Sequence, residues 1–325
     1  MRLLIVGVGA LGGVIGARLL ARGVSVALAT RDASSAAGLK AAGLHVTGVG
    51  GEVAARGVDV RALGDWPQSA FDLVVLATKA DDALSIAPRC VELLAPGGTL
   101  LPIQNGAVAQ VLARQHSRVV LGGLSNLGAT MMAPGRYEQR NAGHILMGEL
   151  AGGMTERATQ IASFLNLGIE TRTTANMNGA IWSKLLLNCT VTTLGAVAGT
   201  TMRGYITHPE GRALFDRTYD ETLSVAFASG VRPERMLVDP IPPLDRDAWI
   251  DRILAAYGDL RPSMHQDFER GRPTEIEFIN GYVAKLGLEL GVLAPLNAAI
   301  ADTVRAISRG ESKPSLENLA RILRG

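Results

Sequence analysis

The chain has 325 residues, of which 47% are hydrophobic and 19% are charged, so it can bury a sizeable core and does not belong to the disordered class. At roughly 150 residues per domain, this length predicts two domains. Lys+Arg 32 against Asp+Glu 30 leaves a formal charge of +2, and aromatic residues make up only 4%, which argues against partners such as nucleic acid or an anionic membrane.

No targeting segment or membrane span is predicted. The N-terminal apolar stretch is short and runs directly into glycines. The most apolar later stretch, 185–198, contains Asn188 and several threonines and is shorter than the about 20 residues that a spanning helix needs. Cys90 and Cys189 are too few for a disulfide framework and fit a reducing compartment. The sequence therefore predicts a cytoplasmic protein.

The first half of the chain alternates short β-rich runs with helical patterns. Strands alternating with helices predict a parallel sheet with helices on both faces. We assign residues 1–172 to an α/β Rossmann-type doubly wound sheet domain, with strands expected at 2–6, 24–29, 72–77 and 99–103 and helices at 10–22, 80–94 and 106–115.

The alternation stops after about residue 172. The remaining chain contains long helical patterns interrupted by glycine and proline. We therefore expect an all-α C-terminal domain over 173–325, with helices at 176–200, 209–229, 245–269, 274–290 and 295–309.

A glycine-rich loop follows the first predicted strand and opens the first predicted helix. Gly7, Gly9 and Gly12 have the spacing G-x-G-x-x-G in the strand–helix context that dinucleotide binding requires. The first glycine permits the tight turn, the second lets the backbone approach a pyrophosphate, and the third lets helix and strand pack closely. The helix N-terminus supplies N–H donors for the phosphates. The predicted pyrophosphate-binding residues are Gly7, Val8, Gly9, Ala10, Leu11 and Gly12.

The end of the second predicted strand bears on the choice between NAD and NADP. An acidic residue there accepts hydrogen bonds from a ribose 2′-OH, whereas an arginine suits a 2′-phosphate. The chain has Arg31 followed by Asp32. Arg31 favours NADP, and Asp32 is the competing candidate that would favour NAD.

Polar residues also follow the third and fourth predicted strands. Lys79 comes just after 72–77, and Asn105 comes just after 99–103. Ligands of open α/β folds bind at the carboxyl ends of the strands, so both residues are expected at the cofactor crevice. The alternative for each is an exposed loop residue.

The most apolar stretch of the second domain carries a lysine. Lys184, Asn188 and Thr192 are four residues apart, which predicts that they share one face of a helix. Burying an ammonium among leucines is costly without a partner, so we interpret Lys184 as a group that meets a carbonyl oxygen. The alternative is a lysine whose ammonium extends to solvent from a core helix.

A second polar stretch, 272–281, is predicted to start a helix with acidic residues in its first turn. Thr274 as cap or Pro273 at the first position suits a helix start, and Glu275 and Glu277 suit the helix dipole. This capping role is a complete structural explanation for one of the glutamates.

These residues resemble the ketopantoate reductase (2-dehydropantoate 2-reductase) family over nearly the whole chain. The matching motifs are GVGALGG at 7–13, LATK at 76–79, IQNG at 103–106, WSKLLLNC at 182–189 and RPTEIEFINGY at 272–282. The resemblance implies NADPH-dependent reduction of 2-dehydropantoate to (R)-pantoate in pantothenate biosynthesis. It makes Lys184 the general acid and Glu275 its acidic partner near the cofactor.

The resemblance also implies the remaining site residues. Besides the glycine loop, the cofactor would be bound by Arg31, Lys79, Asn105, Ala129 and Glu275. The small-molecule 2-keto acid would be bound by Asn105, Lys184, Asn188, Thr192 and Ser263. No metal is implied, and the histidines show no H-E-x-x-H spacing. A homodimer formed through the helical domain is left open.

Two positions depart from the family pattern. Thr192 and Leu260 stand where well-studied members carry asparagines. Threonine can still form a hydrogen bond with a hydroxyl group, whereas leucine cannot. The alternative is therefore a reductase or dehydrogenase of the same family that acts on a more apolar 2-keto or 2-hydroxy acid, similar to D-mandelate dehydrogenase. A non-catalytic NADP sensor is the second alternative, although a sensor has no need of Lys184.

Overall fold

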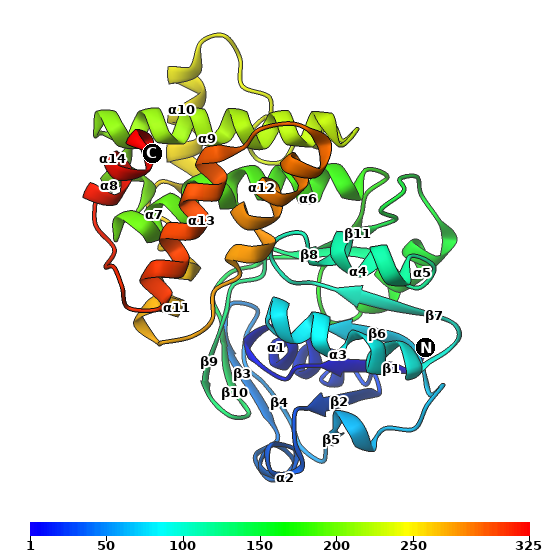
Figure 1. The fold of residues 1–325 in the computed structure, drawn as a ribbon. Coiled ribbons are helices and arrows are strands. Elements are labelled where there is room, and N and C mark those ends of the chain that lie inside the picture. The colour runs from blue at the N-terminus through cyan, green and yellow to red at the C-terminus, as the bar shows by residue number, and fades with distance from the viewer. The chain divides into compact units, whose positions relative to one another are not determined.

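The computed structural model describes residues 1–325 and divides the chain into two compact units, Met1–Met177 and Asn178–Gly325. The first unit contains all the strands, and the second is entirely helical (Figure 1). The predicted order of an α/β doubly wound domain followed by an all-α domain is confirmed.

A five-stranded parallel sheet forms the centre of the first unit. Its strand order is β5-β2-β1-β6-β7. The chain therefore adds strands first on one side of β1 and then on the other, as in other doubly wound sheets. The register aligns Val6, Ala29, Leu76 and Pro102, so the strands that carry the predicted site residues end in one row. The strands are β1 (Leu3–Val6), β2 (Val26–Thr30), β5 (Asp59–Ala62), β6 (Phe71–Leu76) and β7 (Leu94–Pro102).

Five α-helices belong to this unit. Helix α1 contacts β1 and β2, and α2 contacts β5. Helices α3 and α4 both contact β7. Each strand residue from Leu73 to Leu76 is buried, which explains the continuous apolar run in the sequence. The helices are α1 (Ala10–Leu20), α2 (Ala33–Ala42), α3 (Ala80–Glu92), α4 (Val108–His116) and α5 (Glu156–Leu165).

Two smaller sheets were not predicted. One has four strands in the order β4-β3-β10-β9 and packs against α1, and the other has three in the order β12-β11-β8. Their strands are short and several bury only alternate residues, which gives a weak pattern in sequence. They are β3 (Leu44–Gly48), β4 (Val53–Ala55), β8 (Gly122–Ser125), β9 (Ala129–Ala133), β10 (Arg136–Gln139), β11 (Ile145–Gly148) and β12 (Thr171–Thr173).

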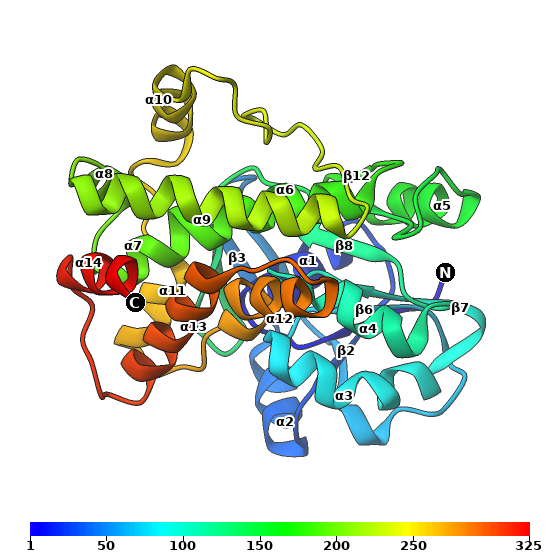
Figure 2. The same ribbon diagram turned by 45° about the horizontal axis from the view of Figure 1, so that its top comes forward.

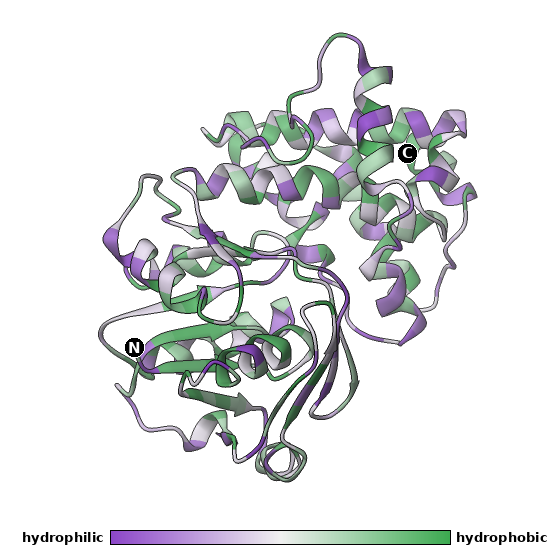
Figure 3. Ribbon diagram, turned by 180° about the vertical axis from the view of Figure 1, so that it is seen from behind, coloured by the Kyte–Doolittle hydropathy of each residue, from purple (hydrophilic) through white to green (hydrophobic).

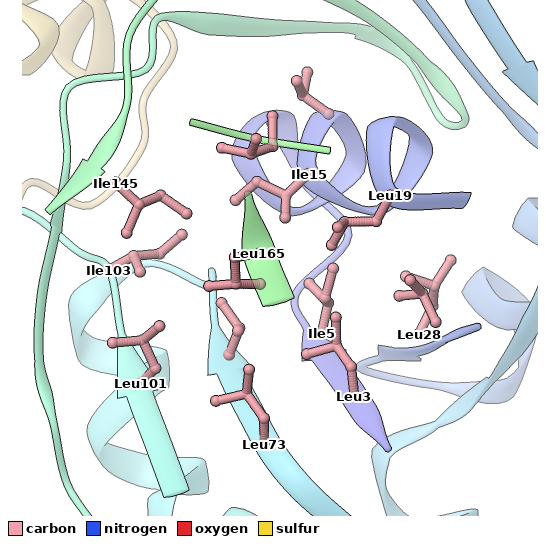
Figure 4. Close-up of a cluster of buried hydrophobic side chains, with 14 of the residues drawn as sticks. Leu3, Ile5, Ile15, Leu19, Leu28, Leu73, Leu101, Ile103, Ile145 and Leu165 are labelled. Carbon is pink, nitrogen blue, oxygen red and sulfur yellow. The ribbon is translucent and has the colours of Figure 1, made fainter. Parts of the chain in front are cut away.

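The core of the first unit forms around α1. Figure 4 shows Ile15 and Leu19 of this helix beside Leu3 and Ile5 of β1, with Leu165 of α5 in the same cluster. All five side chains are at most 1% exposed. This packing fixes α1 over the sheet, and with it the loop that precedes the helix.

The second unit is built around a long helix, α9, which contacts α8, α12, α13 and α14 (Figure 2). Each of its helices carries both hydrophobic and hydrophilic residues, as expected for helices with one buried face (Figure 3). They are α6 (Met177–Leu187), α7 (Thr193–Ala198), α8 (Met202–Ile206), α9 (Pro209–Ala228), α10 (Arg246–Tyr257), α11 (Ser263–Glu269), α12 (Asn280–Leu290), α13 (Pro295–Ser308) and α14 (Glu317–Arg324).

Two helix predictions in this unit were wrong in detail. The single helix expected over 245–269 is two helices, α10 and α11, because Pro262 disfavours a helical conformation at the residue before it and has no N–H to continue a helix. The helix expected from 274 begins only at Asn280, after a 3₁₀ turn at Ile276–Phe278. The short helices α8 and α14 were not predicted.

A continuous helical stretch, Met177–Ala198, is long and apolar enough to cross a membrane by length and composition. It is longer than the 185–198 stretch considered in the sequence. However, 78% of its most apolar window is buried inside the protein, as in the core helix of a soluble protein.

Replacing Leu165 with alanine should lower the free energy of unfolding by about 2–5 kcal/mol, because Leu165 is 0% exposed and its removal leaves a cavity in the core. Leu167→Ala is the matched control, since Leu167 is 54% exposed. Urea unfolding of both variants tests this, and equal losses in the two would contradict the placement of Leu165 in the core.

Candidate active site

The glycine loop between β1 and α1 has the backbone geometry that its sequence predicts. Gly7 has φ +92°, a conformation that favours glycine, and a Cβ there would lie 2.6 Å from Cγ2 of Thr78. A Cβ on Gly12 would collide with the carbonyl oxygen of Gly7. Any side chain at either position would therefore push the loop away from β6 or α1.

Gly9 is the position where a ligand can approach the backbone. It is the N-cap of α1, and a Cβ built on it would meet nothing within 4 Å. The helix has no side-chain cap and no acidic residue in its first turn, so its first N–H groups are not satisfied by a side chain. An open position in front of uncapped helix N–H groups fits the pyrophosphate of a dinucleotide.

A tyrosine from the second sheet supports this loop from behind. The Tyr137 ring occupies the place that a Cβ on Gly13 would need, and its hydroxyl donates a hydrogen bond to the carbonyl oxygen of Val8 over 3.0 Å. Tyr137 is 1% exposed, and burial raises the pKa of its phenol to about 12. The sequence shows Gly13, the last glycine of GALGG, but nothing in it points to Tyr137.

The strand ends place Lys79 and Asn105 at the same edge of the sheet. Each lies three residues beyond the aligned row of Leu76 and Pro102. Gln104 joins the two loops, because its amide nitrogen donates to the carbonyl oxygens of Leu76 over 3.0 Å and Thr78 over 3.1 Å. Lys79 is exposed and precedes α3, whereas Asn105 is half-buried.

At the end of β2, the two competing residues have different surroundings. Asp32 is the N-cap of α2 and accepts a hydrogen bond from the Ser35 backbone N–H over 2.7 Å, which lowers the pKa of its carboxyl group. The Arg31 side chain is 94% exposed, with Nε 3.5 Å from Oδ2 of Asp32. Asp32 therefore already has a structural role, whereas Arg31 is open to a ligand. Ala129 lies apart from this row, on β9 of the second sheet, where it packs partly buried against the core.

In the second unit, Lys184 lies on α6 and is half-buried, and its chain neighbours Trp182 and Leu185 are buried. Burial lowers the pKa of the Lys184 ammonium to about 8, and the negative charge of Glu275 partly opposes this shift. Lys184 is thus protonated at neutral pH and loses its proton as the pH rises through about 8. A pKa near the working pH suits a general acid.

The two glutamates of the 272–281 stretch have different partners. Glu277 forms a bidentate ion pair with Arg305 of α13, with both N–O distances 2.7 Å, and this pair lowers the pKa of Glu277. Glu275 is the one whose charge acts on Lys184. The expected helix cap around Thr274 does not form, because the chain makes a 3₁₀ turn in which Ile276 and Ile279, three residues apart, are both buried.

The helix that carries Lys184 is not regular. Residues Asn188–Thr192 form a π-helical segment between α6 and α7, so the assumption of plain α-helical spacing from Lys184 to Thr192 was wrong. The hydroxyls of Thr192 and Thr193 both donate to the Asn188 carbonyl oxygen, over 3.0 and 2.8 Å. The Thr192 hydroxyl proton is thus used within the helix, which leaves its oxygen as an acceptor.

Asn280 holds this π-helical segment. Its side chain is 0% exposed, and its amide nitrogen donates to the Cys189 carbonyl oxygen over 3.2 Å and to Oδ1 of Asn297 over 3.0 Å. The same amide therefore connects the stretch that carries Glu275 to the helix that carries Lys184. The sequence shows Asn280 within a motif but gives no sign of this contact.

Ser263 lies at the first position of α11 and is exposed. The preceding Pro262 packs on Gly195 of α7, where a Cβ would lie 2.9 Å from the proline ring. Ser263 is thus placed near the helical stretch that continues from Asn188 and Thr192. Leu260, two residues before Pro262, is 50% exposed.

The structure thus gathers the predicted residues into two groups, one in each unit. The glycine loop, Arg31, Lys79 and Asn105 lie at one edge of the parallel sheet. Lys184, Asn188, Thr192, Glu275 and Ser263 lie around the α6–α7 stretch. No group of three or more His, Cys, Asp or Glu side chains is arranged to hold a metal ion. A dinucleotide loop together with a lysine of lowered pKa is typical of one class, the nicotinamide-dependent oxidoreductases.

Comparisons with known proteins agree with this class. The family model described as ketopantoate reductase PanE/ApbA matches residues 3–152, and that of its C-terminal part matches residues 176–308. Because these matches together span most of the chain, the protein belongs to the ketopantoate reductase PanE/ApbA family.

Individual relatives cover almost the whole chain at low identity. A 2-dehydropantoate 2-reductase of Archaeoglobus fulgidus is 26% identical over 310 residues, 95% of this chain and 98% of that protein. The crystal structure of a PanE/ApbA family ketopantoate reductase from Ralstonia eutropha matches with TM-score 0.81 and 26% identity, covering 96% and 99% of the two chains. A D-mandelate dehydrogenase with NADH and anilino(oxo)acetate has the same fold, with TM-score 0.81 and 22% identity over 95% and 99%.

Replacing Asn280 with alanine should lower the free energy of unfolding by about 1–3 kcal/mol, because two buried acceptors, the Cys189 carbonyl oxygen and Oδ1 of Asn297, each lose a hydrogen bond. Lys285→Ala, at an exposed position of the same helix, should be nearly neutral. Chemical unfolding of both variants checks the contact, which would be refuted if Asn280→Ala were as stable as the unchanged protein.

Proposed function

We propose that the protein reduces 2-dehydropantoate to (R)-pantoate with NADPH, and that Lys184 is the general acid. The observation that carries this proposal is the half-buried Lys184, with a pKa of about 8 and Glu275 as its partner, in a member of the ketopantoate reductase family. The family supports the reaction type. The choice of substrate and cofactor rests on the residues discussed next.

The cofactor residues of the first unit have separate tasks. The uncapped N–H groups of α1 behind Gly9 bind the pyrophosphate, and the Arg31 guanidinium binds the 2′-phosphate of the ribose. Lys79 and Asn105 orient the cofactor from the neighbouring strand ends, and Ala129 contributes an apolar contact. When bound, the nicotinamide supplies a hydride to the keto carbon of the substrate.

Lys184 moves the proton. As the keto carbon becomes tetrahedral, negative charge develops on its oxygen, and the Lys184 ammonium stabilises this charge and donates a proton to the oxygen. Glu275 keeps the lysine protonated at neutral pH, since its carboxylate raises the lysine pKa against the effect of burial. Proton donation of this kind typically contributes about 10²–10⁴-fold to the rate.

The substrate residues bind the rest of the keto acid. The Ser263 hydroxyl, at the start of α11, donates to the substrate carboxylate, and the amides of Asn188 and Asn105 bind its oxygens. The Thr192 oxygen accepts from a substrate hydroxyl, because its own proton is used by the Asn188 carbonyl oxygen.

Leu260 favours a second candidate substrate. Its exposed apolar side chain stands near Ser263, where an asparagine would offer a hydrogen bond. An apolar 2-keto acid such as phenylglyoxylate would match this side chain better than a hydroxylated one. A D-mandelate dehydrogenase of the same fold has been solved with NADH and anilino(oxo)acetate.

Steady-state oxidation of NADPH with ketopantoate, phenylglyoxylate and 2-ketoisovalerate, repeated with NADH, separates these candidates. We expect the highest kcat/KM with ketopantoate and NADPH. Faster turnover of phenylglyoxylate would transfer the assignment to an apolar keto acid, with the chemistry of Lys184 unchanged. Tight NADPH binding without turnover of any keto acid would instead support the sensor.

Arg31→Ala should raise KM for NADPH about tenfold or more and leave KM for NADH nearly unchanged, because a charged hydrogen bond to the 2′-phosphate contributes about 1.5–3 kcal/mol. Arg56→Ala, another exposed arginine of the first unit, serves as the control. Equal changes in KM for both cofactors would refute the assignment of Arg31 to the 2′-phosphate.

Lys184→Ala should lower kcat by about 10²-fold or more and change KM for NADPH little. In the unchanged protein, kcat/KM should fall as the pH rises through about 8, since the lysine loses its proton there. Glu275→Gln removes the charge that raises the lysine pKa, so this fall should shift to lower pH. A loss of NADPH affinity with kcat unchanged in Lys184→Ala would show that the lysine only binds cofactor.

The proposal also covers the cellular compartment and the oligomeric state. Cys90 and Cys189 are both buried and unpaired, which is compatible with a reducing cytoplasm. We also propose a homodimer, as a prediction that light scattering on the purified protein can test.

A further inference from the structure

A pocket of about 470 Å³ lies in the first unit, at the end of α1 opposite the glycine loop. Its wall combines the last turn of α1, the turn between β3 and β4, the end of β10 and the turn before β12. The lining residues used below are Arg18, Ala21, Arg22, Gly50, Gln139 and Glu170. This volume is within the range of small-molecule sites, about 300–1,000 Å³.

The pocket contains a buried positive charge without a counter-ion. Arg18 is 8% exposed, and it donates from Nε to Oε1 of Gln139 over 3.1 Å and from its two terminal nitrogens to the carbonyl oxygens of Gly50 and Val49, each over 2.8 Å. These acceptors are all neutral, and Arg18 forms no salt bridge. Three of its five N–H groups are used, which leaves one on each terminal nitrogen.

The surroundings add to this charge and do not neutralise it. Arg22 lies four residues further along the chain, just beyond the end of α1, and burial and the Arg22 charge both lower the pKa of Arg18. The carboxylate that lines the pocket and the one beside the Val49–Gly50 turn have other partners. Glu170 pairs with Arg172 over 2.6 Å, and Glu52 pairs with His45 over 2.6 Å.

The hydrogen bonds of Arg18 also fasten the turn at Val49 and Gly50, but this role does not require a charge. Burying an ion without a counter-charge costs free energy that a neutral donor would avoid. The C-terminal end of α1, whose last turn contains Arg18, favours nearby cations, yet this effect is small. A guanidinium that lines a pocket with two N–H groups left over is the arrangement that recognises planar or tetrahedral anions.

We propose that this cavity, the Arg18 pocket, binds a small polyanion, either phosphate or a compact polycarboxylate. The anion is held by the remaining N–H groups of Arg18, with Arg22 at the rim. The site is distinct from the glycine loop, because Gly9 and Arg18 lie nine residues apart on α1, about 13 Å along a helix.

Calorimetric titration of the full-length protein with inorganic phosphate and, separately, with citrate tests this proposal. Ala21 lines the pocket and is exposed, so Ala21→Glu places a competing carboxylate there, while Ala21→Gln has the same size without the charge. We expect one ion bound per chain, at least about tenfold weaker binding in Ala21→Glu, and little change in Ala21→Gln. Arg22→Met should weaken binding severalfold, and the stronger of the two probes identifies the anion class.

The titrations are repeated with NADP⁺ to separate this pocket from the cofactor loop. Binding that survives NADP⁺ and is lost in Ala21→Glu belongs to the Arg18 pocket. Equal affinities in Ala21→Glu and Ala21→Gln, or no binding of either ion up to millimolar concentration, would overturn the proposal and leave Arg18 as a clamp of the turn. Neither result depends on which keto acid the enzyme reduces.

Discussion

The free energy of burying an ammonium is the main constraint on the part of the second unit around Lys184. Burial draws the pKa of Lys184 down toward neutrality, and one carboxylate, Glu275, limits how far it falls. Such a balance requires that the lysine and the glutamate be held at a fixed separation by their surroundings. The π-helical segment, the buried Asn280 amide and the 3₁₀ turn after Glu275 supply that rigidity. The apolar helix that carries Lys184 and the polar stretch that carries Glu275 thus act together on the pKa of Lys184.

The two glutamates of this stretch, Glu275 and Glu277, have different electrostatic partners. Glu277 is neutralised by Arg305 on the surface, where an ion pair of this kind contributes little to stability. Glu275, by contrast, acts through its charge on the pKa of Lys184.

Much of this arrangement was accessible from the sequence because the signals were local. The glycine loop, the buried strands and the apolar helix around Lys184 each follow from residues within about ten positions of one another. The features that were missed depend on contacts between distant segments. Tyr137 fills the space left by Gly13 from a strand that bears no distinctive pattern, and Asn280 satisfies a carbonyl group about ninety residues away. The late start of α12 likewise reflects the burial of Ile276 and Ile279, which overrides a sequence well suited to an earlier helix.

The π-helical segment has a consequence for how this protein compares with its relatives. A single π turn amounts to one extra residue inserted in an α-helix, which rotates everything beyond it by about 100°. Thr192 therefore faces a direction that another residue would face in an uninterrupted helix. A relative lacking one residue between 188 and 192 could align well on both sides of the gap and still present a different side chain beside Asn188. In such a protein, substrate preference would change through the rotation of the helix alone, without any substitution among the residues proposed to bind the keto acid.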